Sequence, residues 1–108
     1  MEIAAGLIKL KPNMCSELRE WRDTLQGKCR EVRACLREEG VALEAWFEIE
    51  IKCEPYLLWV MQAKSVAEAR RVFMNSTREI DAFHLEKMMR IGDDQIEARL
   101  LIDMGRTP

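Results

Sequence analysis

The only histidine of the chain and a nearby aspartate are the residues best suited to acid–base chemistry. Asp81 precedes His84 by three positions, which is about one turn of a helix. A carboxylate at that spacing can fix the tautomer of an imidazole and raise its basicity, so the pair is a candidate general base. A half-buried helix residue with a hydrogen-bond partner explains the same pair, and we favour that explanation because no nucleophile pattern accompanies it.

Two glutamates spaced four positions apart form a second candidate. Glu44 and Glu48 lie on one face of a predicted strand, with Trp46 between them. In an enclosed site, paired carboxylates shift each other's pKa and serve acid–base work, which adds Glu48 to the catalytic candidates Asp81 and His84. Exposed carboxylates that discourage pairing at a sheet edge give the same pattern. Both interpretations stay open.

A ligand site is suggested by aromatic and basic side chains. Trp46 and Trp59 can stack on a flat ligand, with Met61 beside them. Arg99 can bind an anionic group, or can pair with Glu44 across a dimer. Such tryptophans more often belong to a core or an interface, and we favour a structural ion pair as the role of the arginine. The sequence has no glycine-rich phosphate loop and no metal-ligand spacing, so we expect neither cofactor nor metal.

Two strands must position most of these residues. Residues 41 to 51 alternate between two sets with a period of two, and a second strand reaches Ala63 after a Cys53-Glu54-Pro55 connection. Such alternation is typical of half-buried strands. We expect helices to cover the aliphatic set, which comprises Val41, Leu43, Ala45, Phe47, Ile49 and Ile51. The opposite face would then be open and would carry Glu44, Trp46, Glu48, Arg99, Leu101, Ala4, Gly6 and Ile8. The second strand of the pair adds either Trp59 and Met61 or Leu58 and Val60 to this face, and we favour Trp59 and Met61.

The remaining elements follow from periodicity and capping signals. Gly6 inside the first strand suggests a bulge or a close approach of another group, and Gly27 suggests an irregularity in the long first helix. The expected elements are a strand from Glu2 to Leu10, a helix ending near Glu39, a helix from Ser65 to a break near Asn75, a helix from Thr77 to Ile91, a strand from Ile96 to Met104 and a frayed tail from Gly105 to Pro108.

Composition excludes several classes of protein. The chain has 108 residues, which fits one domain over residues 1–108. A formal net charge of −2 argues against a nucleic-acid binder. No apolar run approaches the roughly 20 residues of a membrane span. The four cysteines have no paired-ligand spacing and no export signal accompanies them, so we expect reduced thiols and a cytoplasmic location.

The order strand, helix, strand, strand, helix pair, strand predicts an α+β fold. It is the ferredoxin-like split β-α-β plan, a four-stranded antiparallel sheet with helices on one face. The uncovered face is too apolar for a soluble monomer. We therefore expect a homodimer that packs sheet against sheet.

Four stretches carry a resemblance to a family of short bacterial proteins without assigned function: IAAGLIKLKP (residues 3–12), EAWF (44–47), YLLW (56–59) and IDAFH (80–84). The chain also resembles the dimeric α+β barrel group, which includes antibiotic-biosynthesis monooxygenase-like and rhamnose mutarotase-like domains. The resemblance implies a small organic ligand held between the sheet and the helices or between two sheets.

Three functions fit this resemblance. A homodimeric small-molecule-binding domain is the leading hypothesis. A cofactor-independent enzyme of the monooxygenase-like or mutarotase-like kind is the alternative. Mutarotase-like members have a histidine on the first helix, and this chain has none there. A structural interaction module is the third hypothesis.

Overall fold

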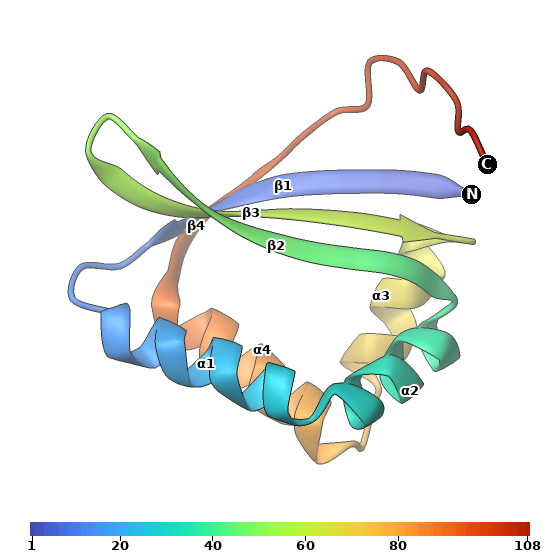
Figure 1. Ribbon diagram of the computed structural model, residues 1–108. Coiled ribbons are helices and arrows are strands. Elements are labelled where there is room, and N and C mark those ends of the chain that lie inside the picture. The colour runs from blue at the N-terminus through green and yellow to red at the C-terminus, as the bar shows by residue number, and fades with distance from the viewer.

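The computed structural model describes residues 1–108 as an antiparallel sheet with helices on one side (Figure 1). The elements are β1 (Glu2–Leu10), α1 (Cys15–Gly27), α2 (Cys29–Glu39), β2 (Val41–Ile51), β3 (Glu54–Ala63), α3 (Val66–Met74), α4 (Glu79–Ile91) and β4 (Gly92–Glu97). The strand order is β2-β3-β1-β4 and every pair is antiparallel. This is the ferredoxin-like α+β architecture that the element order predicts.

A two-residue turn joins β2 to β3. Ile51 pairs with Glu54, and the residues between them, Lys52 and Cys53, have φ angles of 51° and 65°. Positive φ at both central positions is the geometry that matches the twist of a two-residue hairpin. The connection is therefore Lys52-Cys53, and the expected Cys53-Glu54-Pro55 connection was placed one residue too far along the chain.

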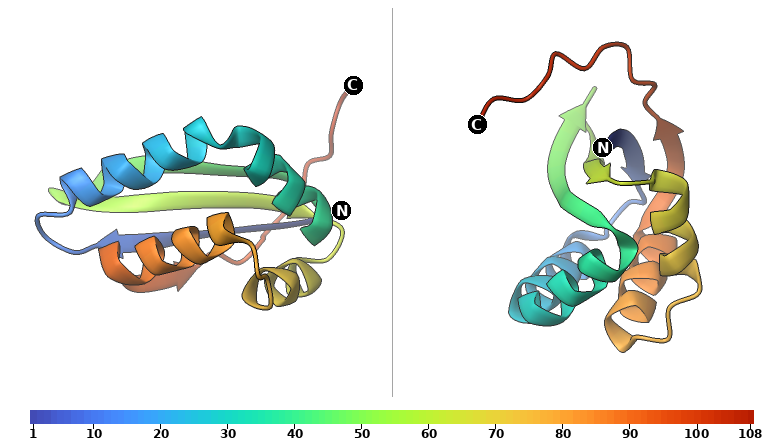
Figure 2. Two further views of the ribbon diagram at one scale, coloured as in Figure 1. Left: turned by 90° about the horizontal axis from the view of Figure 1, so that it is seen from below. Right: turned by 90° about the vertical axis from the view of Figure 1, so that its right-hand side faces the viewer.

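The expected long helix is broken in two. Lys28 lies outside helical geometry and ends α1 while it begins α2. The irregularity expected at Gly27 is thus a complete break. After it the buried side of the helix includes Cys35, whereas Cys29 is exposed. The two helices meet at an angle that the views from below and from the side make clear (Figure 2).

The predicted assignment of the sheet faces was wrong, because it is inverted. Trp46 and Trp59 pair across β2 and β3 and pack against the buried core between sheet and helices. Phe47 lies on the uncovered face and is 52% exposed. The tryptophans lie on the helix side, where Trp21 meets Trp46 and Gly6 leaves room for the Trp59 ring. Ile8, Leu10 and Leu57 are buried beside them.

The uncovered face is nevertheless apolar. Its large exposed side chains come from β2 and β4, and half-buried aliphatic side chains from β1 and β3 lie between them. These residues, which we call the open face, are Leu43, Phe47, Ile49 and Ile96, with Ile3, Leu7, Leu58 and Val60.

Gly6 makes room for one of the tryptophans. A Cβ atom at Gly6 would lie 2.8 Å from Nε1 of Trp59 and 2.9 Å from the carbonyl oxygen of Ile96. Real Cβ atoms do not approach so closely, and the second neighbour is backbone that cannot step aside. The close approach expected at Gly6 is therefore the approach of the Trp59 ring on the helix-covered side.

The last strand is shorter and earlier than expected. β4 starts directly after α4 at Gly92 and ends at Glu97, where the sequence pattern predicted a strand from Ile96 to Met104. One further backbone bond joins the Ala98 N–H to the Ala5 carbonyl. Beyond it the chain leaves β1 and crosses to the side of the sheet opposite the helices (Figures 1 and 2). Alternation from residue 98 onward therefore has no neighbouring strand to pair with.

A buried lysine ties the last helix to the first. Lys87 is 7% exposed, and its ammonium group pairs with Glu17 and Glu20 on α1. The hydrogen bond to Glu17 is the largest cause that raises the pKa of Lys87.

None of the helices is both long and apolar enough to cross a bilayer.

Candidate functional site

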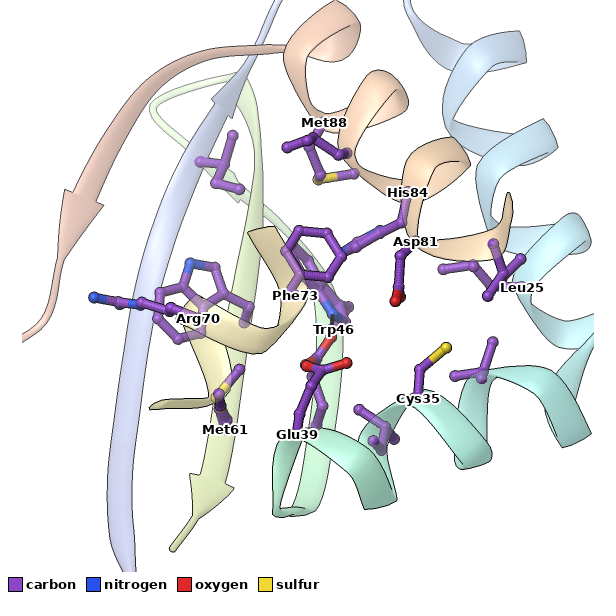
Figure 3. A pocket seen from close by; sticks show the side chains of 18 of the residues that line it. Leu25, Cys35, Glu39, Trp46, Met61, Arg70, Phe73, Asp81, His84 and Met88 are labelled. Carbon is purple, nitrogen blue, oxygen red and sulfur yellow. Dashed lines mark hydrogen bonds between the residues drawn. The ribbon is translucent and has the colours of Figure 1, made fainter. Parts of the chain in front are cut away.

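A cavity of about 380 Å³ lies between the sheet and the helices. Volumes of this size suit small organic ligands. Its walls are mostly apolar and its polar groups converge from five elements (Figure 3). The polar and aromatic lining residues are Cys35, Glu39, Glu44, Trp46, Trp59, Arg70, Phe73, Asp81, His84, Gln95 and Glu97.

An aromatic cluster holds His84 in place. The indole N–H of Trp21 donates a 2.8 Å hydrogen bond to Nδ1 of His84. Trp46 meets the edges of both rings, with centroids 5.3 Å from Trp21 and 5.5 Å from His84. Because Nδ1 accepts, a neutral imidazole carries its proton on Nε2. Burial lowers the pKa of His84 to about 4, and the nearby Asp81 only partly opposes it. His84 is therefore neutral at pH 7 and offers the cavity a donor.

Burial raises the pKa of two glutamates of the cavity. Burial raises the pKa of Glu39 to about 7, and Glu44 and Asp81 raise it further by repulsion. Burial also raises the pKa of Glu44, although the indole N–H of Trp46 donates a 2.9 Å hydrogen bond to its Oε2. A carboxyl group with a pKa near 7 can either give or take a proton at neutral pH.

The cysteine of the cavity is unreactive. Cys35 is 4% exposed, and burial together with Asp81 raises the pKa of its thiol to about 11. Only a thiolate is nucleophilic, so Cys35 contributes packing and not covalent chemistry.

An ion pair stands at the edge of the cavity. The guanidinium of Arg70 on α3 donates a 2.9 Å hydrogen bond to Glu97 on β4. The same group lies 5.9 Å from the ring centre of Trp59, within reach of a cation–π contact. Both side chains are exposed. Figure 3 shows Arg70 beside the Trp59-bearing strand and away from Glu39 and Asp81.

The structure gathers most of the sequence-predicted site residues. Those that line the cavity are Glu44, Trp46, Trp59, Met61, Asp81 and His84. Glu48 lies outside it and is exposed on β2, so the structure does not bring it into the cavity with Glu44. Arg99 lies in the exposed segment after β4, also outside the cavity. The Asp81–His84 pair is half-buried, and the hydrogen-bond partner of the histidine is Trp21 and not the aspartate.

Sequence reasoning missed Glu39, the most buried carboxylate of the chain at 8% exposed. A signal was available, because Glu39 follows Val32 and Cys35 on the apolar side of its helix. An acidic residue at an apolar position of an amphipathic helix is a candidate functional group. The run Arg37-Glu38-Glu39 hid it among surface charges.

The raised pKa of Glu39 predicts a dependence of stability on pH. The folded protein keeps a proton on Glu39 up to a pKa of about 7, whereas the ordinary value is 4.5. The contribution of this group to stability therefore falls as the pH rises from 4.5 to 7, by at most about 1.4 kcal/mol per pH unit. The neutral variant Glu39→Gln loses this dependence. Its free energy of unfolding, measured by urea titration relative to the wild type, should rise across that window.

The variant must be compared with the wild type because the pKa shift of His84 changes the stability of both proteins with pH, in the direction opposite to that of Glu39. The lowered pKa of His84 makes stability rise with pH between about 4 and the ordinary value of 6.5. Glu31→Gln is the matched control, since Glu31 is exposed on the same helix. A flat difference for Glu39→Gln would show that Glu39 is ionised in the folded protein.

A model of the family described as "Family of unknown function (DUF6176)" matches residues 1–107. No curated protein matches the chain. Three solved structures share its fold, and their identities of 11% to 18% show the fold alone.

The first of these structures is an L-rhamnose mutarotase from Formosa agariphila, with a TM-score of 0.65, 18% identity, and coverage of 97% of this chain and 100% of that one. An uncharacterized NIPSNAP-like domain protein from Burkholderia xenovorans has a TM-score of 0.65, 11% identity, and coverage of 98% and 88%. The NE2512 protein of unknown function from Nitrosomonas europaea has a TM-score of 0.51, 14% identity, and coverage of 98% and 94%.

Proposed function

Because this chain belongs to DUF6176, a family of unknown function, its role must be inferred from its own site, and we propose that it is a homodimeric domain that binds a small organic molecule. The observation that carries the proposal is the cavity of about 380 Å³ between sheet and helices. It joins an apolar wall to a few convergent polar groups, which is the usual composition of a ligand site.

The polar groups of the cavity support binding. Glu39 is buried, and neither of its oxygens has a hydrogen-bond or ion-pair partner in the protein. Nε2 of His84 likewise has no protein partner, while Nδ1 is held by Trp21. No wholly buried side-chain nitrogen or oxygen is left without a partner, so both groups are open to the cavity and to what it binds. A ligand with hydroxyl groups, which both donate and accept, would satisfy both.

The open face supports the homodimer. Leu43, Phe47 and Ile96 are each about half exposed there, and aliphatic side chains of the other strands lie between them. A contiguous apolar surface across a whole sheet exceeds what soluble monomers normally leave in water. A second copy related by a two-fold axis presents the same surface and would cover it.

Ligand binding should raise the melting temperature. A compound that binds only the native state stabilises it by about 2.7 kcal/mol at 100 times its Kd, which corresponds to several degrees for a domain of this size. The measurement is a fluorescence melting screen of amines, sugars and small acids at millimolar concentration. Val32→Phe fills part of the cavity from α2 and should abolish the shift. Val72→Phe on α3, outside the cavity, should keep it.

Proton transfer is the second candidate, favoured by the carboxyl group of Glu39. Its pKa of about 7 suits a general acid or base at neutral pH. The fold is shared with a protein described as an L-rhamnose mutarotase. A sugar that raises the melting temperature and whose anomers interconvert faster with the wild type than with Glu39→Gln would favour the enzyme. If no compound shifts the melting temperature, ligand binding is contradicted. The structural interaction module is then the remaining hypothesis.

A further inference from the structure

Glu39 is the starting point for identifying the ligand. Its side chain belongs to a residue that is 8% exposed, it lines the cavity, and no N–H or O–H of the protein donates to it within hydrogen-bond distance. Figure 3 shows its carboxylate turned toward the middle of the cavity, where the carboxylate of Asp81 also points. No wholly buried side-chain oxygen is left without a partner, so this carboxylate is open to the cavity and free to accept a partner that enters it.

Several carboxyl groups gather in the cavity. Glu39, Glu44 and Asp81 line it together, and each of the last two raises the pKa of Glu39 by repulsion. The only N–H that reaches one of them from a side chain is the Trp46 indole, which donates to Glu44. Like charges gathered in a dry site oppose their own ionisation.

No basic group of the protein neutralises this cluster. Arg70 is paired with Glu97 at the edge of the cavity. Arg78 is paired with Glu38 outside it, although its charge also acts on Asp81. His84 is held neutral by burial, and the Cys35 thiol is uncharged. The groups that face the cluster from α2, α3, α4, β2 and β4 therefore add no free positive charge.

Aromatic rings complete the walls. Trp46, Trp59 and Phe73 line the same cavity as the carboxylates. The negative faces of aromatic rings attract cations, most strongly where water is excluded. The Arg70 guanidinium makes such a contact with Trp59 at the edge of the cavity, which shows that this ring attracts a cation.

We propose that the ligand is an organic cation, an ammonium or guanidinium group on a small apolar body, bound with its charge at Glu39, Glu44 and Asp81 and its body against Trp46, Trp59 and Phe73. This proposal rests on the proposed function, since it names the chemical class for the same cavity. Neutral polyols can form hydrogen bonds to Glu39, Glu44 and Asp81, but they bring no positive charge to balance these carboxyl groups. An anion would add a further negative charge.

The experiment compares matched probes by isothermal titration calorimetry on the full chain. The cations are butylammonium, cyclohexylammonium and choline, and each amine is paired with the neutral alcohol of the same carbon skeleton. We expect at least one cation to bind tenfold or more tightly than its alcohol. Its affinity should rise as the pH increases from 6 to 8, because a deprotonated Glu39 is the better partner for a cation.

Two variants test the named residues. Glu39→Gln keeps the shape and removes the charge, and Asp81→Asn does the same on the opposite side of the cavity. Each variant should lower the affinity for the cation about tenfold or more, and Glu39→Gln should also abolish the dependence of this affinity on pH. Glu31→Gln, exposed on α2, should leave the affinity unchanged. Circular dichroism of each variant verifies that the fold is retained.

The outcomes separate this proposal from the more general one. The proposal of an organic cation is overturned if the alcohol and the amine bind equally well. It is also overturned if Glu39→Gln leaves the affinity for the cation unchanged. Binding of L-rhamnose or another neutral sugar, with no binding of the cations, also overturns it while the proposed function stands. If no probe binds and the melting screen finds no ligand, both proposals fail.

Discussion

Trp21→Ala is expected to lower the free energy of unfolding by about 3–5 kcal/mol, the range for removing a large buried aromatic ring. Trp21 is 6% exposed and belongs to the central cluster of the core. Its ring meets Trp46 of β2 at 5.3 Å and stacks on His84 of α4 at 5.9 Å. It therefore joins the first helix, the last helix and the sheet at one point. Urea denaturation followed by circular dichroism measures the loss.

The matched variant Trp21→Phe separates packing from hydrogen bonding. Phenylalanine keeps much of the ring but removes the N–H that donates to Nδ1 of His84. A buried acceptor without a donor costs about 1–3 kcal/mol. The freed nitrogen can also take up a proton, so the pKa of His84, followed by NMR, should change in Trp21→Phe. Equal losses for the alanine and phenylalanine variants would show that the hydrogen bond, and not the ring, holds the helices together.

The architecture was predictable because its signals are local. Alternation over residues 41–51, the capping box at Ser65 and the glycine after the first helical segment each act within one element. The structure shows a strand at Val41–Ile51, a Ser65 side chain that accepts from the Glu68 N–H, and Gly40 at a φ of 73°. Element order then fixes the ferredoxin-like plan, because few other arrangements of these elements keep short, right-handed connections.

The orientation of the sheet was not predictable from alternation alone. A period of two separates the side chains of β2 into two sets, but it does not say which set the helices cover. Here both sets are apolar enough to be buried, since one holds Phe47 and the other Trp46. The contacts that decide the matter come from distant parts of the chain, where Trp21 meets Trp46 and Gly6 admits Trp59.

The site was only partly predictable for the same reason. Trp46, Asp81 and His84 stood out by residue type, and all three line the cavity. Glu39 did not, because its importance depends on burial and on carboxylates from β2 and α4. Glu48 has the same residue type as Glu44 and follows it by four positions on the same strand, yet Glu44 lines the cavity and Glu48 is exposed.

Phe47→Glu is expected to convert the proposed homodimer into a folded monomer. Phe47 lies near the middle of β2 on the open face, and it is 52% exposed in the single chain. A carboxylate there would be buried without a partner in each copy, at a cost of several kcal/mol per charge. Since 1.4 kcal/mol is a factor of ten in Kd, dimer affinity should fall by about 100-fold or more. Sedimentation velocity at micromolar concentration measures the change.

The control replaces an apolar side chain that is more exposed than Phe47 and lies on the other side of the sheet. Met89 on α4 is 71% exposed and lies on the helical side of the sheet, so Met89→Glu should leave the sedimentation coefficient of the wild type unchanged. Because the Phe47 ring contributes little to the core of the single chain, Phe47→Glu should keep its melting transition as a monomer. A wild type that sediments at the mass of one chain, or a Phe47→Glu variant that remains dimeric, would show that the open face is not the interface. In that case the aliphatic side chains of β2 and β4 need another cover, and the nearest segment of the same chain is the apolar run Leu100-Leu101-Ile102, which already crosses to that side of the sheet.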